Sequence, residues 1–246
     1  MFARFCLGLV VCLSTFSVAH AEIMIPTSAG IGADARVTLG SPNTNFGSSE
    51  FFAIQNRITA PANARKTYLR FDLAALTSAA ASASLQITPN NDFSVGAGVT
   101  FNLYGLNDLD AGEFWNESTI TWNNAPQNDT GSNNGLLAGA TLLDSFVFNT
   151  DFVDGTPIVF SSAAIASFLN ADSNDAATFI LTRSGTGTIN FTFASKENTE
   201  EYLVPLLTVN PVPEPSTLVA MTILFSCCGV TGTIRRAKRR AIQRNA

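Results

Sequence analysis

The sequence predicts an all-β protein: a jelly-roll-like β-sandwich ectodomain with an apolar segment at each end of the chain. Apolar and polar residues alternate with a period of two along most of the interior, which is typical of half-buried strands. Stretches rich in Asn, Asp, Gly and Ser, such as residues 123–135, separate these runs and are typical of turns. About nine or ten short strands within one unit favour a sandwich over other all-β folds.

Residues 67–73 show the alternation most clearly, because Leu69 and Phe71 share one face while Arg70 and Asp72 share the other. Further strands are expected at residues 84–88, 99–103, 120–122, 146–148, 158–160, 179–182, 189–193 and 206–209. The chain contains 19 Phe residues, and those at inward positions would fill the sandwich core.

One short helix is expected at residues 163–169, following a cap at Ser161-Ser162. Ile165, Phe168 and Leu169 would share its apolar face.

The first 21 residues have the three parts of a secretory signal peptide. Arg4 is the basic region, residues 5–16 are mostly apolar, and Ala19 and Ala21 place small residues at the −3 and −1 positions. The apolar run is short for a bilayer span, which disfavours the alternatives of a membrane anchor or an N-terminal core helix. We therefore expect signal peptidase to cleave after Ala21.

A second apolar segment, residues 216–234, contains no charged residue and would be about 28 Å long as a helix, close to the thickness of a bilayer core. The tail at residues 235–246 carries six basic residues, a feature that marks the cytoplasmic side of a membrane. The sequence therefore predicts a transmembrane helix and a cytoplasmic tail; the alternative is a buried C-terminal helix with a solvated basic end.

A short Pro-rich linker, residues 211–215, precedes this segment and includes Pro213, Glu214 and Pro215. The Pro-Glu-Pro triplet, the apolar segment and the Arg-rich end together resemble the PEP-CTERM sorting signal. The resemblance implies recognition and cleavage by an exosortase in Gram-negative bacteria that make exopolysaccharide. The mature product would then be released or attached at the cell surface after transient anchoring in the inner membrane.

Removal of both ends would leave residues 22–210 as the ectodomain. Residues 22–211 contain 7 Lys and Arg against 18 Asp and Glu, a net charge of −11, and neither Cys nor His. This composition excludes disulfides, Cys/His zinc sites, and Ser-His-Asp or Cys-His catalysis. Such an acidic surface repels nucleic acid, so no nucleic-acid partner is expected.

Four carboxylates lie in one predicted loop and are compatible with binding of a hard cation such as Ca²⁺. They belong to Asp108, Asp110, Glu113 and Glu117. The spacing is not that of an EF-hand, because Thr119 occupies the position of the final Glu ligand. The alternative is a solvated acidic loop without a metal.

Several runs of the ectodomain together resemble the DNRLRE family of extracellular domains, which includes carbohydrate-binding modules. The block Trp115–Pro126 is the most specific match. Weaker matches lie at residues 45–47, 68–73, 84–87, 194–197 and 205–207. The resemblance covers roughly residues 24–209 and implies a jelly-roll sandwich and, in some members, binding of acidic polysaccharide.

Five residues within or beside these matches are candidate ligand-binding residues: Arg70, Asp72, Trp115, Lys196 and Glu197. Trp115 could offer a flat face to a sugar, whereas Trp122 is expected in the core. Arg70 is the best candidate for a buried bidentate bond with a carboxylate. The alternative is that the charged residues form exposed ion pairs, which are usually structural.

The leading hypothesis is an exported, non-enzymatic protein of the cell surface or exopolysaccharide matrix that associates with carbohydrate. With only seven basic residues, the domain fits neutral glycans, or acidic glycans bridged by Ca²⁺, better than a tight alginate-like ligand. One alternative is a structural or adhesive surface protein without a glycan site. A second is a polysaccharide lyase or hydrolase that uses Tyr, Lys or carboxylates.

Overall fold

A computed structural model describes residues 21–96, 98–200 and 203–212. Residues 21–212 form one compact unit. The predicted signal peptide (apart from Ala21), the Pro-Glu-Pro motif, the predicted transmembrane helix and the basic tail lie outside the described residues. Among the residues that are described, no helix is long and apolar enough to cross a membrane.

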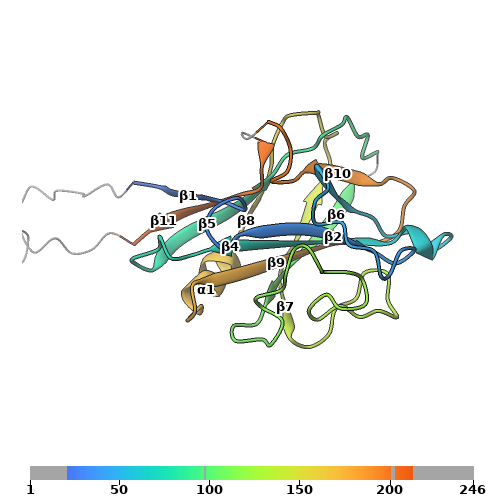
Figure 1. Cartoon of the computed structure of the whole chain (residues 1–246). Helices are drawn as coiled ribbons and strands as arrows, with labels where there is room; N and C mark the ends of the chain where they lie inside the picture. The colour runs from blue at the N-terminus through green and yellow to red at the C-terminus, as the bar shows by residue number, and fades with distance from the viewer. Residues whose placement is uncertain (1–20, 97, 201–202, 213–246) are drawn as a thin grey trace, which may run out of the picture. The chain divides into compact units, whose positions relative to one another are not determined.

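The compact unit is built from two main antiparallel sheets and one additional strand pair (Figure 1). The four-stranded sheet has the order β1 (Ile23–Pro26), β11 (Leu206–Pro211), β5 (Ala80–Ile87) and β8 (Ile158–Ser161). The five-stranded sheet has the order β2 (Ala33–Thr38), β4 (Arg65–Asp72), β9 (Ala176–Ser184), β6 (Val99–Leu106) and β7 (Ala140–Phe148). The pair consists of β10 (Phe191–Ala194) and β3 (Phe51–Ile54). The described part also contains the helix α1 (Ala163–Asn170) and the 3₁₀ turn η1 (Pro61–Asn63).

The main core lies between the sheets, as expected for a β-sandwich. Inward residues of both sheets contribute to it, including Leu85 of β5, Phe71 of β4 and Phe179 of β9. Phe101 of β6 is at its centre, with ring-centroid distances of 5.4–6.5 Å to five other Phe rings. The predicted use of Phe as core filling is therefore confirmed.

A second core lies on the outer face of the five-stranded sheet. The long connection between β6 and β7 places Trp115, Ile120 and Trp122 against the small residues Ala33 and Ala35 of β2. Both faces of this part of the sheet are therefore buried. Eight of the nine residues of β9 are buried. Tyr68 of β4 is also inaccessible, because it belongs to this second core.

The all-β prediction is confirmed, and most predicted strands correspond to observed ones. The predicted strand at residues 120–122 is wrong, because the chain forms turns there. The apolar–polar alternation at Ile120 and Trp122 arises because both side chains pack onto the sheet. The segment itself is not paired with a neighbouring strand. The helix prediction is confirmed, although Ser162 makes no side-chain capping hydrogen bond. Strands β1, β2 and β3 were not anticipated.

Candidate functional site

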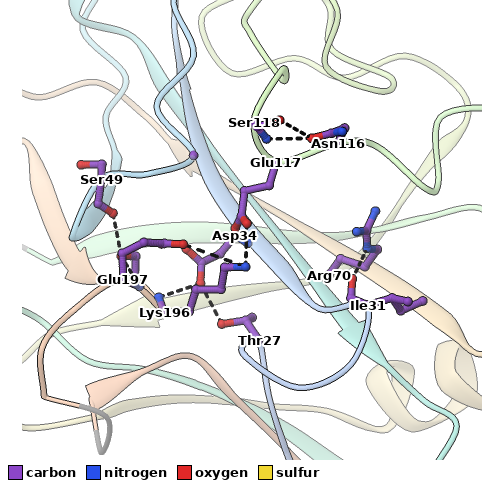
Figure 2. Close-up of polar contacts among 12 residues, drawn as sticks. Thr27, Ile31, Asp34, Ser49, Arg70, Asn116, Glu117, Ser118, Lys196 and Glu197 are labelled. Atoms are coloured by element: carbon purple, nitrogen blue, oxygen red, sulfur yellow. Dashed lines mark hydrogen bonds and ion pairs between the residues drawn. The ribbon is translucent and has the colours of Figure 1, made fainter.

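Three carboxylates from distant parts of the chain meet beside β2 (Figure 2). Asp34 comes from β2, Glu117 from the β6–β7 connection, and Glu197 from the turn after β10. One carboxylate oxygen of each lies within 4.8 Å of the others. The Lys196 ammonium lies 2.6 Å from Glu117 Oε2 and 3.9 Å from Glu197 Oε1. We call these four residues the Asp34 cluster.

Asp34 is the most buried member of the Asp34 cluster, with 1% of its surface exposed. Its Oδ2 accepts hydrogen bonds from Thr27 Oγ1 at 2.7 Å and from the Lys196 backbone N–H at 2.9 Å. Burial raises the pKa of Asp34 to about 7, and the nearby Glu197 and Glu117 charges add to this rise. Burial also raises the pKa of Glu197. Sequence reasoning identified Lys196, Glu197 and Glu117 as candidates but missed Asp34.

Arg70 and Asp72 both form hydrogen bonds with the turn before β2. Arg70 Nε donates to the Ile31 carbonyl at 2.8 Å, and the Ile31 N–H donates to Asp72 Oδ2 at 3.0 Å (Figure 2 shows the Arg70 contact). Arg70 Nη1 donates to the Trp115 carbonyl at 2.6 Å. The guanidinium therefore binds backbone carbonyls, and the predicted bidentate bond to a carboxylate is not formed.

Most of Trp115 is buried against the five-stranded sheet. Only 7% of the residue is exposed, and its ring packs edge-on against Tyr68 with a centroid distance of 6.2 Å. The indole N–H donates to Thr178 Oγ1 at 3.2 Å. Trp115 is thus part of the second core, as Trp122 is, although it also contributes to the lining of a small pocket beside Phe114.

The four carboxylates of the predicted calcium loop do not come together. Asp108 and Glu113 lie close to Asp172, which the sequence did not suggest. Asp110 instead accepts a hydrogen bond from Gln127 Nε2 at 2.7 Å. Glu117 lies in the Asp34 cluster, where its Oε1 also accepts the Asp34 backbone N–H at 2.8 Å.

Lys66 of β4 holds the β6–β7 connection against the sheet through hydrogen bonds from its ammonium group. Its side chain is fully buried, and its ammonium lies 4.5 Å from the centroid of the Trp122 ring. Burial lowers its pKa to about 8. The ammonium donates to four oxygens of the connection: Asn128 Oδ1 at 2.7 Å and the carbonyls of Asp129, Ser132 and Gly135 at 3.3, 3.0 and 2.6 Å.

An exposed aromatic ring lies beside a small polar pocket in the same connection. Phe114 is 60% exposed, although it precedes the buried Trp115 directly. The pocket has a volume of about 150 Å³, and Asn116, Thr119 and Asn124 contribute polar groups to its lining. Sequence reasoning missed Phe114, because nothing in the sequence shows which of two adjacent aromatic residues faces the core.

This pocket, which we call the Phe114 pocket, combines an accessible ring with amide and hydroxyl groups. A flat apolar ring can pack against the C–H face of a sugar, while amides and hydroxyls bind sugar hydroxyls in either donor or acceptor role. A few convergent polar groups around an apolar surface are the usual composition of small-ligand sites.

Residues 27–141 match the family model described as carbohydrate-binding module family 96. This segment contains the Phe114 pocket and two of the three carboxylates of the Asp34 cluster. The match supports a carbohydrate-binding-like domain. No curated protein matches the sequence.

Among solved structures, the chain resembles two structures of a recombinantly expressed latent aurone synthase (polyphenol oxidase). Both were co-crystallized with hexatungstotellurate(VI), and the first was also soaked in H₂O₂. The identity is 14% in both cases, with TM-scores of 0.36 and 0.29. The alignments cover 71% and 73% of this chain but 28% and 26% of the synthase. The chain thus spans little more than a quarter of those proteins, and the likeness carries no inference about activity.

Proposed function

We propose that this chain is an exported, non-enzymatic protein of the cell surface or exopolysaccharide matrix, and that it binds carbohydrate at the Phe114 pocket. The observation that carries the proposal is the match of residues 27–141 to a carbohydrate-binding module family. The ectodomain is proposed to be a jelly-roll sandwich, which is also what the resemblance of its strands and of the Trp115–Pro126 block implies.

The Phe114 pocket is the best glycan-binding candidate because it is accessible and its polar groups are not charged. Its volume of about 150 Å³ is below the roughly 300–1,000 Å³ of typical drug-sized ligand sites, so it would hold one sugar unit of a longer chain. The scarcity of basic residues in residues 22–211 favours a neutral glycan, which such a pocket can bind without ion pairs.

The test is retention of the purified full chain in affinity gels that contain neutral or acidic polysaccharides, together with a glycan array. Phe114→Ala should reduce retention about two- to tenfold, because packing against an aromatic ring contributes on the order of 0.5–1.5 kcal/mol. Val153→Ala is the matched control, since Val153 is another exposed apolar loop residue, 54% exposed, outside the pocket. Absence of binding to every polysaccharide, with or without Ca²⁺, would refute the proposal.

An adhesive role without a glycan site is the second candidate, and one observation favours it. Strand β7 lies at an edge of the five-stranded sheet, where Leu142 and Val147 are 50% and 61% exposed. An edge strand with exposed apolar residues can pair with another chain. This candidate predicts concentration-dependent assembly, measured by light scattering, together with no glycan retention.

The export route is part of the proposal and has its own test. We infer that signal peptidase removes residues 1–21 and that an exosortase removes the C-terminal segment at the Pro213–Pro215 motif. Mass spectrometry of the protein from its native host should find Glu22 at the N-terminus and no peptide from residues 235–246. A mature chain that retains the basic tail in the membrane would contradict the processing step.

A further inference from the structure

We propose that Asp34, Glu117 and Glu197 form a binding site for a divalent cation of the calcium class, a property separate from glycan binding. The site differs from the calcium loop that the sequence suggested, because two of its three ligands lie outside that loop.

The first argument is convergence. The three carboxylates come from segments that are 83 and 80 residues apart along the chain, yet one oxygen of each lies within 4.8 Å of the other two. Figure 2 shows the three side chains directed toward one another around the Lys196 side chain. Carboxylate oxygens are the ligands that Ca²⁺ prefers, and it accepts irregular arrangements of six to eight of them.

The second argument is that the cluster contains buried oxygens without a hydrogen-bond donor. Asp34 Oδ1 and Glu197 Oε2 are inaccessible and have no partner among the described residues. Asp34 is 99% buried, and its other oxygen already accepts two hydrogen bonds. A buried carboxylate oxygen with no donor destabilises the folded state, and a cation bound to it would remove that cost.

The third argument is charge. When all three carboxylates are ionised, they and the one ammonium give the Asp34 cluster a net charge of −2, which one divalent cation neutralises. Glu117, Glu197 and Lys196 have side chains that are 21%, 26% and 20% exposed, so a cation and its water ligands can enter from solvent. The long Lys196 side chain can turn outward while its backbone N–H keeps its bond to Asp34.

The other group of three carboxylates among the described residues, Asp108, Glu113 and Asp172, also has one buried oxygen without a donor, Asp108 Oδ1, but this oxygen belongs to a residue that is not fully buried. Glu113 Oε2 accepts a hydrogen bond from the Leu109 N–H at 3.1 Å and another from Asn174 Nδ2. Asp108 Oδ2 accepts one from Ser173 Oγ at 2.6 Å. Asp108 is also only half-buried. The most buried member of this second group, Glu113, has its Oε2 occupied by two donors, so Asp108→Asn serves as the matched control for the Asp34 cluster.

The experiment is calorimetric titration of CaCl₂ into the full chain, purified in mild detergent and stripped with EGTA, without any glycan present. We expect one site with a dissociation constant between about 10⁻⁵ and 10⁻³ M, the range of sensor and extracellular calcium sites. Glu197→Gln should weaken binding at least tenfold, because it removes one ligand charge. Asp108→Asn should leave the affinity unchanged, because Asp108 belongs to the other group.

Lys196→Met distinguishes a metal site from an ordinary ion-pair cluster. Removal of the ammonium leaves three carboxylates without a counter-charge, so Ca²⁺ should bind more tightly and should raise the melting temperature of this variant more than that of the wild type. Circular dichroism checks that the variants are folded. No heat and no thermal shift at about 10 mM CaCl₂, tenfold above the weakest expected constant, would overturn the proposal. Binding that Asp108→Asn abolishes and Glu197→Gln leaves intact would also overturn it.

Discussion

Replacement of Lys66 by Met tests whether one buried ammonium holds the β6–β7 connection on the sheet. Met keeps the length and the apolar stem of the side chain but has no donor. The change would leave four oxygens of the connection without the ammonium that binds them now.

The expected loss can be estimated from these contacts. A buried acceptor without a donor costs about 1–3 kcal/mol, and the desolvated contact with the Trp122 ring adds up to about 2 kcal/mol. Two effects reduce this loss. Among the four residues that supply the acceptors, only Asn128 is buried, so water can reach the other three acceptors. The variant also no longer has to desolvate an ammonium group. We therefore expect Lys66→Met to lower the free energy of unfolding by about 2–4 kcal/mol.

The assay is urea denaturation of the full chain followed by tryptophan fluorescence, combined with hydrogen exchange. Exchange should accelerate most in residues 128–136. Arg57→Met is the control, since it removes a cation whose one side-chain hydrogen bond is long and exposed. An unfolding free energy of Lys66→Met within about 0.5 kcal/mol of wild type, with unchanged exchange in the connection, would refute the reasoning.

Three further predictions follow from burial and hydrogen bonding. Because burial lowers the pKa of Lys66 from 10.5 to about 8, the unfolded chain binds more protons than the folded chain between these pH values, and stability rises with pH across that window. From pH 8 to 10.5, the unfolding free energy of the wild type should rise by up to about 3 kcal/mol relative to that of Lys66→Met, as measured by denaturation at each pH. A difference between the two proteins that stays constant with pH would contradict this. Phe101→Ala should lower the unfolding free energy by about 3–5 kcal/mol, whereas Phe114→Ala should change it by less than about 0.5 kcal/mol, both measured by denaturation. Arg70→Met should accelerate hydrogen exchange around Ile31, because it removes a donor to the Ile31 carbonyl; unchanged exchange there would show that Asp72 alone holds the turn.

The sequence predicts a strand well where large apolar residues alternate with polar ones, and it missed β2, whose buried residues are mostly small. Strand β4 was recognised because Leu69 and Phe71 alternate with polar residues. Strand β2 was missed because its buried residues include Ala33 and Ala35, whose small side chains give a weak pattern. Those residues are small because the tryptophans of the β6–β7 connection need room on the outer face of the sheet.

The candidate sites were harder to predict, because they depend on contacts between distant segments. Glu117 was grouped with its sequence neighbours, yet its partners are Asp34 and Glu197. The acidic residue in Ala33-Asp34-Ala35 gives no sign of its environment in the sequence alone. Only the register of β2 against β4 and the path of the long connection bring the three carboxylates together.

The block Trp115–Pro126 carries the most specific family resemblance, but its tryptophans are buried. Trp122 is fully buried and Trp115 is 7% exposed, and both pack on β2 and β4. Their presence is thus explained by packing, because bulky rings on the connection complement small residues on the strand. Packing therefore accounts for both tryptophans, although Trp115 also lines the Phe114 pocket. In the proposed function the exposed Phe114 contacts the glycan, and experiments can separate this role from the packing role of the tryptophans. Trp122→Ala should unfold the connection, with a loss of about 3–5 kcal/mol, whereas Phe114→Ala should reduce glycan retention and leave stability unchanged.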